Sequence, residues 1–410
     1  MKRSVKLLGL GLVAALGLGV DGCPPAAGPF KCADGSAATG FIEAPKGAEK
    51  TGKYIVVLKA SAASRSAASL GMTGASRVGA RMAVGTMTLA AAKAAAADPG
   101  VQFVQEETVK RIQGFEVEGP SSIESSETLW GRDRVDQHAL PLDGADFAPN
   151  GTGAGIDVCI VDTGVDPLHP AVKGRLVAAH ASLGSDTGDA HGHGTHVAGT
   201  AVSVRRGVAH VSAVLSCRCL NADGSGTDSS VAACIDWCAE QQKARGNPMA
   251  LNMSLGGPVS PALDLSVCRA AQQGIAVVVA AGNSAHNACD GSPSRVDLAW
   301  TIGATDKPIK SQSGIWWETR SDFSNYGPCV DLFAPGRDIL SARRGDHDDN
   351  DPVSYSGTSM ASPHVCGAAA LCLERGADLG ACLIDASTKD SLAPDRVGDG
   401  SPNRLLYLGR

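Results

Sequence analysis

The segment Ile156-Asp157-Val158-Cys159-Ile160-Val161 is the first of five short apolar runs that decide the expected fold. The other four lie at residues 211–220, 250–255, 275–281 and 300–304, and stretches of helical character at 227–244 and 260–273 separate several of them. Near-continuous apolar strands that alternate with helices are typical of a parallel sheet covered on both faces. We therefore predict an α/β domain with a mainly parallel central sheet over residues 130–410.

The composition is that of a globular protein. Of the 410 residues, 43% are hydrophobic and 19% are charged, which allows a sizeable buried core and excludes disorder as the main state. Aromatic residues make up only 4%, so Ala, Val, Leu and Ile must fill the core, while 50 glycines allow many tight turns. The net charge is −6 and the chain has no Lys/Arg tract, so we expect no nucleic-acid partner.

The N-terminus has the features of an export signal. Lys2, Arg3 and Lys6 precede an apolar run over residues 7–20. A run of this length fits the core of a signal peptide, which we place at residues 1–22, and it is too short for a membrane span. Val20-Asp21-Gly22-Cys23 resembles a bacterial lipobox, although an acidic residue is atypical there. Two outcomes therefore stay open: secretion, or a bacterial lipoprotein held at the membrane by a lipid anchor on Cys23.

The cysteine content also indicates export. Thirteen cysteines are many for a reducing cytosol and are typical of an oxidising compartment, where disulfides persist. The sequence does not give their pairing. Eleven of them lie beyond residue 120, and from this odd number we expect that at least one lacks a partner within the chain.

A small module is expected before the main domain. Residues 23–52 are rich in Pro, Gly, Ala and Lys and are interpreted as a linker. A strand at 53–59, a helix at 88–97 and a strand at 101–104 then give a β-α-β pattern, which predicts a small α/β module over residues 53–113. Residues 114–129 are polar, with Gly, Pro and Ser, and are expected to form an exposed linker.

Four polar side chains stand where predicted strands end or helices begin. Asp162 and Asn283 each follow an apolar strand, and His193 lies at the start of an Ala/Gly-rich helix. Ser359 is expected at or just before the start of another helix, because Pro363 suits a first helical turn. Ligand crevices of parallel sheets lie beyond the carboxyl ends of the strands. Taken singly, each residue also has an ordinary explanation as a turn residue or a helix cap.

The histidines near residue 193 offer a metal site as an alternative. His191, His193 and His196 lie within six residues. The helical zinc site of metalloproteases, however, needs two histidines four residues apart with a glutamate between them. His193 and His196 are three apart, with Gly and Thr between them, so the spacing argues against a zinc site.

In combination, the segments around these residues resemble the signature blocks of one family, the subtilisin-like serine proteases. The three blocks are Asp162-Thr163-Gly164, His193-Gly194-Thr195-His196-Val197-Ala198-Gly199 and Gly357-Thr358-Ser359-Met360-Ala361-Ser362-Pro363. The segments at 130–137, 223–226 and 323–327 are similar to the proteinase K-like branch. This resemblance covers residues 130 to about 405, and the module at 53–113 looks like the inhibitory propeptide of the family.

The resemblance implies a catalytic triad. A serine hydroxyl is a weak nucleophile and needs an adjacent base. By resemblance, Ser359 is the nucleophile, His193 is the base, and Asp162 orients the imidazole. Asn283 and the backbone N–H of Ser359 are expected to stabilise the oxyanion. The chain order Asp, His, Ser is that of subtilisins and not of α/β-hydrolases, although Gly357-Thr358-Ser359-Met360-Ala361 nearly matches the nucleophile motif of lipases.

The resemblance also assigns substrate-binding residues. Two backbone segments are expected to hold an extended peptide between them by strand addition, and three small residues are expected to line the primary specificity pocket. The two segments are Gly224, Ser225, Gly226 and Ser254, Leu255, Gly256, and the pocket residues are Ala280, Ala281 and Gly282. Small lining residues leave room for a large apolar side chain.

Calcium is the structural ion that the resemblance implies. Asp331 aligns with a calcium-binding carboxylate of the proteinase K-like branch, with backbone carbonyls near Val296 and Leu298 as its partners. A solvated loop aspartate is the alternative. The acidic run at residues 346–351 can also attract a hard cation, although most such runs are exposed loops.

We therefore expect an exported zymogen with a subtilisin-like three-layer domain and an inhibitory propeptide. It would act as a monomeric serine endopeptidase on protein or peptide substrates, use no cofactor for catalysis, and be inhibited by its own propeptide until cleavage within residues 113–129. Three alternatives stay open: a catalytically silent peptide-binding protein, a lipid esterase and a metalloprotease. Labelling by a fluorophosphonate distinguishes the first and the last from a serine hydrolase.

Overall fold

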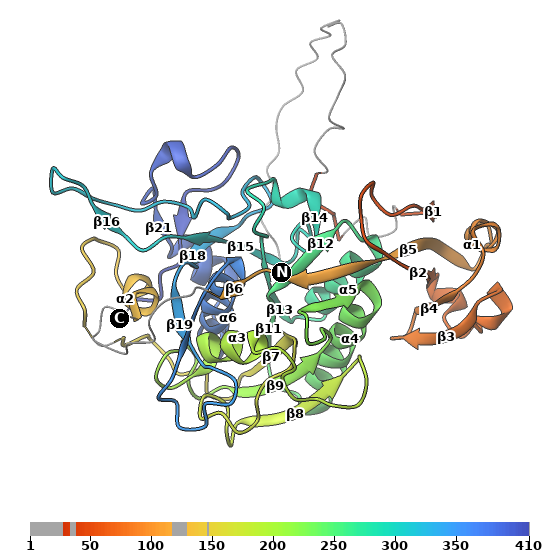
Figure 1. The fold of residues 1–410 in the computed structure, drawn as a ribbon, viewed down its shortest axis with the longest axis horizontal. Helices are drawn as coiled ribbons and strands as arrows, with labels where there is room; N and C mark the ends of the chain where they lie inside the picture. Colours follow the sequence, from red (N-terminus) through yellow and green to blue (C-terminus); the bar gives the residue numbers. More distant parts are fainter. Residues whose placement is uncertain (1–27, 33–37, 117–128, 146, 410) are drawn as a thin grey trace, which may run out of the picture.

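The computed structural model describes residues 28–32, 38–116, 129–145 and 147–409 (Figure 1). The expected signal peptide, Cys23 and most of the expected linker at 114–129 lie outside the described residues. Two parts are distinguished below. The N-terminal module comprises residues 38–112, and the main domain comprises the described residues from 129 onward.

A mainly parallel sheet forms the centre of the main domain. Its strands, in spatial order, are β21 (Thr388–Lys389), β22 (Arg404–Leu405), β18 (Leu332–Pro335), β15 (Trp300–Thr305), β13 (Ala276–Ala280), β11 (Met249–Met253), β7 (Asp157–Asp162), β9 (Ala213–Arg218) and β8 (Leu176–Ala181). Neighbouring strands pair in parallel except β21 and β22, which are antiparallel. The predicted fold class is confirmed.

Helices cover both faces of this sheet. On one face, α3 (His193–Val202) and α6 (Thr358–Glu374) pack against side chains such as Val158 and Ile160 of β7. On the other face, α4 (Asp228–Arg245) and α5 (Pro261–Gln272) pack against Cys159 and Val161 of the same strand. Because successive residues of a strand point to opposite faces, each apolar run fills two cores.

Shorter elements complete the main domain. They are α2 (Trp130–Val135), β14 (Gly291–Ser292), β16 (Ile309–Lys310), β17 (Trp316–Trp317), β19 (Ile339–Ser341), β20 (Val353–Ser356), the π-turn at Ala381–Asp385 and the 3-10 turns at Ala288–Asp290 and Pro394–Arg396. Among the described residues, the structure has no helix with the length and apolar character needed to cross a bilayer.

The N-terminal module is a mainly antiparallel sheet with one helix. It contains β1 (Gly40–Ile42), β2 (Lys50–Leu58), β3 (Thr73–Val78), β4 (Met82–Thr86), α1 (Leu89–Ala96) and β5 (Val101–Ile112), with 3-10 turns at Ala60–Ala62 and Ala68–Leu70. The helix begins after Thr88, whose side chain accepts a hydrogen bond from the Ala91 N–H. The hairpin β3–β4 was not expected from the sequence, and β1 lies within residues 23–52, where a linker was expected.

The two faces of the module sheet have different partners. Val56 and Val104 pack with Ala92 of α1. On the opposite face, Phe103 shares a core with Ala232 of α4 and Ala262 of α5, both in the main domain. One of the two cores of the module is therefore completed by the main domain.

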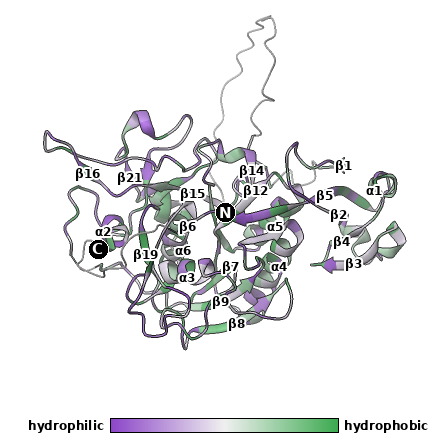
Figure 2. Ribbon diagram, viewed as in Figure 1, coloured by the Kyte–Doolittle hydropathy of each residue, from purple (hydrophilic) through white to green (hydrophobic). Residues whose placement is uncertain are grey.

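Strand β5 runs from the module into the main domain. After pairing with β2, its C-terminal half pairs antiparallel with β10 (Ser225–Thr227) and β12 (Leu255–Pro258) (Figure 1). This half is hydrophilic (Figure 2). The next residues, β6 (Phe115–Glu116), pair antiparallel with β20. The sequence predicted only residues 101–104 as strand, because the continuation is polar and its last residues, 109–112, obtain their strand partners from the main domain.

Five disulfides connect the described residues. They are Cys32–Cys268, Cys159–Cys238, Cys217–Cys234, Cys289–Cys329 and Cys372–Cys382, and Cys219 and Cys366 are free and buried. The prediction that at least one cysteine beyond residue 120 lacks a partner is confirmed. That prediction considered only the eleven cysteines beyond residue 120, whereas Cys268 pairs with Cys32, which precedes them. Phe30 lies beside Cys32 and exchanges backbone hydrogen bonds with Arg295 and Asp297 of the main domain, at 2.8 and 3.1 Å.

Candidate active site

The structure brings the four polar residues of the sequence analysis to one end of the central sheet. Asp162 is the last residue of β7, and His193 is the first residue of α3. Ser359 is the second residue of α6, so Pro363 lies within the helix and not in its first turn. Asn283 follows β13 closely. These positions agree with the rule that crevices form beyond the carboxyl ends of parallel strands.

Asp162 fixes the ring of His193. The Nδ1 of His193 donates a hydrogen bond to Asp162 Oδ1 over 2.8 Å, and both residues are fully buried. The same carboxylate oxygen accepts the Thr163 N–H at 2.8 Å. Because Nδ1 donates to a carboxylate, Nε2 of the neutral ring is left as the acceptor. Nε2 has no hydrogen-bond partner among the described residues, so it is able to accept a proton.

The carbonyl oxygen of Gln113 occupies a pocket with two donors. It accepts the Ser359 backbone N–H at 2.9 Å and the Asn283 Nδ2 at 2.6 Å. Asn283 is held in this orientation because its Oδ1 accepts both the N–H and the Oγ1–H of Thr358, each at 2.9 Å. A Cβ at Gly357 would come within 2.3 Å of the Gln113 oxygen, so glycine is needed for this close approach. Two such donors are what a developing oxyanion requires.

Gly114, the residue after Gln113, lies beside the candidate base and nucleophile. A Cβ added to it would be 3.0 Å from His193 Nε2 and 3.2 Å from Ser359 Cβ. The Ser359 hydroxyl donates to the Ser254 carbonyl at 2.9 Å, so in this structure it is not bonded to His193. A rotation about the Cα–Cβ bond of Ser359 changes this partner without moving the backbone.

Pro363 affects the backbone at Ser359. Proline has no N–H, so the carbonyl of Ser359, four residues earlier, receives no helical hydrogen bond from it. That carbonyl instead accepts the Ser254 hydroxyl at 2.8 Å. Helix α6 is thereby tied to the segment that follows β11.

The two predicted substrate-binding segments hold the chain around Gln113 as a strand. The N–H of Ile112 donates to the Gly224 carbonyl at 3.0 Å, and the N–H of Gln113 donates to the Ser254 carbonyl at 3.1 Å. The remaining members of the segments lie in the ladder: Ser225 opposite Arg111, Gly226 opposite Lys110, Leu255 opposite Ile112 and Gly256 opposite Arg111. Residues 109–113 therefore occupy the place of an extended peptide between β10 and β12.

Ala280, Ala281 and Gly282 line a cavity of about 220 Å³ together with Gln113. Polar residues, including Asn287 and Ser294, lie in the same wall. The space beside the small residues is therefore present, but its lining is more polar than three small residues alone would indicate.

Asp189 was missed by the sequence analysis. Its Oδ1 accepts the Thr163 hydroxyl at 2.8 Å and the Gly192 N–H at 2.8 Å, and its Oδ2 accepts the Thr195 N–H at 2.9 Å. It thereby joins the loop after Asp162 to the first turn of α3. An aspartate four residues before the first residue of the predicted helix was a signal for such a capping role. Thr358, which orients Asn283, was also not singled out.

The structure does not bring the three neighbouring histidines together as metal ligands. His196 Nε2 lies 2.9 Å from the Ile339 carbonyl and 3.2 Å from that of Val353, and its ring stacks on Tyr355. Burial lowers the pKa of His196 to about 3, so the ring is neutral at ordinary pH. His196 is thus a structural residue, packed between α3 and the β19–β20 hairpin.

The expected calcium ligands have suitable chemistry. One carboxylate and two carbonyls are the oxygen donors that Ca²⁺ prefers. Asp331 Oδ2 accepts the Thr301 N–H at 2.9 Å, and the carbonyl of Val296 accepts the Ala299 N–H at 3.1 Å. Leu298 is exposed, between these residues in the chain. Because carboxylate and carbonyl oxygens have two lone pairs, these hydrogen bonds do not by themselves exclude an ion, and the donor types are compatible with calcium.

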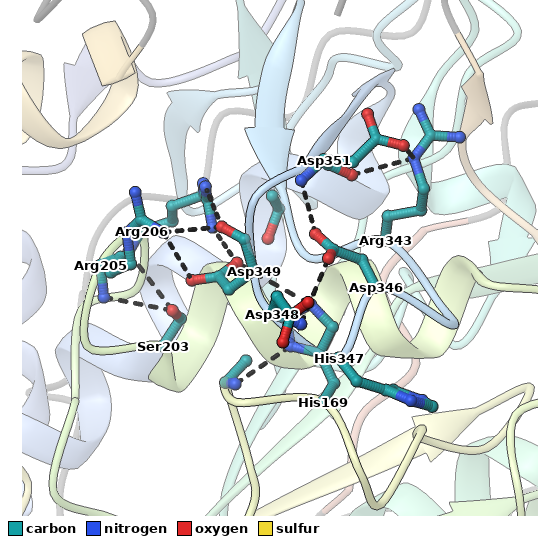
Figure 3. A network of polar contacts seen from close by, with 12 residues as sticks. His169, Ser203, Arg205, Arg206, Arg343, Asp346, His347, Asp348, Asp349 and Asp351 are labelled. Carbon is teal, nitrogen blue, oxygen red and sulfur yellow. Dashed lines mark hydrogen bonds and ion pairs between the residues drawn. The ribbon is translucent and has the colours of Figure 1, made fainter.

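A second group of potential ligands lies at the acidic loop. His169, Asp346 and Asp349 offer atoms within 4.8 Å of one another. Figure 3 shows that Asp349 is also paired with Arg205 and Arg206. His169 Nδ1 accepts the Ala171 N–H at 3.0 Å, so Nε2 carries the proton in the neutral ring and has no lone pair for a metal. The cluster therefore favours charge pairing over metal binding.

Comparisons with known proteins agree with this geometry. The model of the subtilase family matches residues 153–400. The extracellular serine proteinase of Thermus sp. (strain Rt41A) is 39% identical over 317 residues, which cover 76% of this chain and 71% of that protein. The alkaline serine exoprotease A of Vibrio alginolyticus is 38% identical over 314 residues, which cover 76% of this chain and 55% of that protein.

A solved structure is similar over the same region. The crystal structure of a cold adapted subtilisin-like serine proteinase is 39% identical, has a TM-score of 0.60, and is matched over 68% of this chain and 97% of its own. The identity is high enough to carry over the family as well as the fold. The chain therefore belongs to the subtilase family and is a subtilisin-like serine protease.

Proposed function

We propose that the protein is an exported serine endopeptidase made as a zymogen that cleaves itself between Gln113 and Gly114. One observation carries the proposal: the Gln113 carbonyl lies between the Ser359 N–H and Asn283 Nδ2, with Gly114 beside His193. A carbonyl that already meets both oxyanion donors is positioned for attack. Residues 53–113 are the propeptide, residues 114–129 are a processing linker, and residues 130–410 are the catalytic domain.

The geometry supports a conventional acyl transfer. Ser359 Oγ turns from the Ser254 carbonyl, transfers its proton to His193 Nε2, and adds to the Gln113 carbonyl carbon. The oxyanion takes the two hydrogen bonds that the ground-state oxygen already has. Collapse breaks the Gln113–Gly114 bond, and His193 returns the proton to the Gly114 amine. A water then enters, loses a proton to His193, and adds to the acyl carbon. Collapse breaks the bond between that carbon and Ser359 Oγ, His193 returns the proton to Ser359 Oγ, and the Gln113 carboxylate is released.

Asp162 has an electrostatic role in these steps. Its hydrogen bond to Nδ1 holds His193 in the tautomer that accepts a proton at Nε2. The imidazolium that forms is then stabilised by the buried carboxylate. The reaction uses only side chains and backbone of the catalytic domain, and no catalytic cofactor is required in this family.

The same contacts explain inhibition after cleavage. Residues 109–113 fill the groove between β10 and β12 that a protein substrate would need. Two propeptide side chains also reach helix N-termini of the catalytic domain: Glu107 accepts from the Ser229 N–H at 3.2 Å, and Gln105 accepts from the Ala262 N–H at 3.0 Å. The cleaved propeptide is therefore a product-like inhibitor with contacts beyond the groove.

Export and ion binding complete the proposal. The relatives above include an extracellular proteinase, and five disulfides fit an oxidising compartment. Either secretion or a lipid on Cys23 is compatible with the N-terminal sequence. Asp331, with the carbonyls of Val296 and Leu298, is the proposed calcium site, and the protein acts as a monomer on protein or peptide substrates.

The test is the Ser359→Ala variant of the full chain, purified without any other protease. We expect it to remain one uncleaved polypeptide under reducing conditions, while the wild type gives a fragment that ends at Gln113. Ser313→Ala, a serine in the loop between β16 and β17, is the matched control and should process normally. Cleavage of pure Ser359→Ala protein would contradict self-processing, and a wild type that no fluorophosphonate labels would indicate a peptide-binding protein.

A further inference from the structure

A lysine is completely buried in the substrate groove. Counting back from the proposed scissile bond, Gln113 is the first residue and Lys110 is the fourth. The side chain of Lys110 is 0% exposed, although it belongs to the hydrophilic half of β5 (Figure 2). A charged group without water needs a charged or polar partner, so the pocket around it must supply one.

The pocket is built by the catalytic domain and is acidic. Lys110 Nζ lies 2.9 Å from Asp228 Oδ1 and donates to the Pro258 carbonyl at 2.6 Å. A Cβ at Gly257 would lie 3.0 Å from Lys110 Cδ, so glycine leaves room for the aliphatic stem. We name Asp228, Gly257 and Pro258 the Lys110 pocket.

Asp228 is a fixed part of this pocket. It is the first residue of α4, directly after β10, and it is 0% exposed. Its other oxygen, Oδ2, accepts the N–H of Thr108 at 2.7 Å and the Thr108 hydroxyl at 2.8 Å. A helix N-terminus stabilises negative charge. The carboxyl group of Asp228 therefore faces the fourth residue of any peptide bound as residues 108–113 are bound.

A second carboxyl group adds to the acidic character. Asp264 of α5 is fully buried and forms an ion pair with Arg295 at 3.1 Å. Burial raises the pKa of Asp264 to about 7, while Arg295 and, to a smaller extent, Lys110 act against that rise. The lysine thus compensates negative charge on two helices.

We propose that the Lys110 pocket gives the protease a preference for lysine as the fourth residue before the scissile bond of its substrates. This inference rests on the proposed function, since it assumes that substrates bind in the groove as residues 108–113 do. An apolar side chain in the pocket would bury Asp228 without its countercharge, and a glutamate would place two like charges together. Discrimination then comes from the penalty on wrong residues as much as from the contact with the right one.

The test uses internally quenched peptides with the sequence of residues 105–116, which includes Thr108 and both sides of the bond. The residue corresponding to Lys110 is lysine, norleucine or glutamate, and norleucine keeps the stem while it removes the charge. The enzyme is assayed after further digestion has removed residues 38–113 and left only the short peptide joined to Cys268 through Cys32, a state verified by mass spectrometry. We expect kcat/KM to fall at least tenfold from lysine to norleucine and further with glutamate.

Two variants assign the preference to the pocket. Asp228→Asn keeps the shape and should reduce the lysine-to-norleucine ratio of kcat/KM to less than threefold. Glu240→Gln removes the same charge from an exposed position on the same helix and should leave the ratio unchanged. If Asp228→Asn kept the wild-type lysine-to-norleucine ratio of kcat/KM, the assignment of the preference to Asp228 would be overturned. The wild-type comparison needs no variant, so it decides the preference even if Asp228→Asn does not fold.

The two proposals fail in different ways. Cleavage of all three peptides between Gln and Gly at rates within twofold would overturn the lysine preference and leave the endopeptidase intact. Absence of cleavage of the lysine peptide by correctly processed enzyme would count against the proposed function itself.

Discussion

The N-terminal module, which we propose to be a propeptide, and the catalytic domain differ in what holds each of them together. Four disulfides lie within the catalytic domain, and its sheet fills a core on each face. Among the described residues 38–113 there is no disulfide, and one of the two cores of the propeptide needs Ala232 and Ala262 of the catalytic domain. The catalytic domain thus carries its own stabilisation, whereas the propeptide depends on its partner and its attachments to it.

One of these attachments is a disulfide that joins residues on opposite sides of the proposed cleavage site. The largest expected effect is therefore that the two pieces stay joined after cleavage. Cys32 precedes the cleaved bond and Cys268 follows it, so cutting Gln113–Gly114 should leave the two pieces joined. We expect one species on a non-reducing gel and two after reduction. In the double variant Cys32→Ser, Cys268→Ser the pieces should separate without reductant. An intact propeptide fragment that still contains Cys32 and leaves the wild type without reductant would contradict the tether.

The dependence of one core on the other domain can be measured by paired substitutions. In the uncleaved Ser359→Ala background, Phe103→Ala should destabilise the propeptide by about 3–5 kcal/mol, because it empties a buried aromatic site at the shared core. Phe333→Ala empties a buried aromatic site in a core of the catalytic domain and is the matched variant there. Urea unfolding followed by hydrogen exchange should show an effect of Phe103→Ala on residues 50–112 alone.

A different result would change the comparison. If Phe103→Ala and Phe333→Ala lowered hydrogen-exchange protection equally in both regions, the uncleaved chain would unfold as a single cooperative unit, and the N-terminal module could not be described as the dependent part.

The hydrogen bonds to the Gln113 carbonyl are one of the places where the two regions meet, and their loss should affect chemistry more than folding. Asn283→Asp keeps an acceptor for Thr358 but removes the N–H that reaches the Gln113 carbonyl. We expect kcat to fall about 10²–10³-fold, or about 2.7–4 kcal/mol, a magnitude known from subtilisin itself. The rate of processing and the turnover of a peptide should fall together, and the exposed Asn350→Ala is the control. An unchanged kcat would remove Asn283 from the proposed mechanism.

The sequence predicted much of the catalytic domain because its signals are local. The apolar runs predicted five of the nine strands of the central sheet, and the residues at the ends of two of them were Asp162 and Asn283. The propeptide was harder. Residues 105–112 are polar, and the last of them, residues 109–112, pair with β10 and β12 of the other domain, while Cys32 and Cys268 are separated by 236 positions. The location of the Gln113 carbonyl between the Ser359 N–H and Asn283 Nδ2 likewise depends on contacts between distant segments, which no local pattern contains.

The smallest expected effect is a difference in acid sensitivity, since all ten histidines lie beyond residue 129. Burial lowers the pKa of His196 to about 3 and that of His364 to about 4. Below about pH 6.5, these two side chains therefore become protonated in the unfolded chain but stay neutral in the native state. Each of these histidines then lowers the free energy of unfolding by about 1.4 kcal/mol for each pH unit of acidification. Asp264, with its pKa raised to about 7, acts oppositely, because acid protonates it first in the native state.

These opposing groups make the slope between pH 6 and pH 5 a specific test. In the Ser359→Ala background, the free energy of unfolding of the catalytic domain, measured with urea, should fall as the pH is lowered. Asp264→Asn removes the group that opposes the histidines, so the free energy of unfolding should fall with acid by about 1.4 kcal/mol per pH unit more than in the parent protein. His364→Gln should reduce it by the same amount. The propeptide has no histidine, so its own unfolding should not show this slope, and an equal slope in both regions would mean that acid acts on their interface and not on these buried rings.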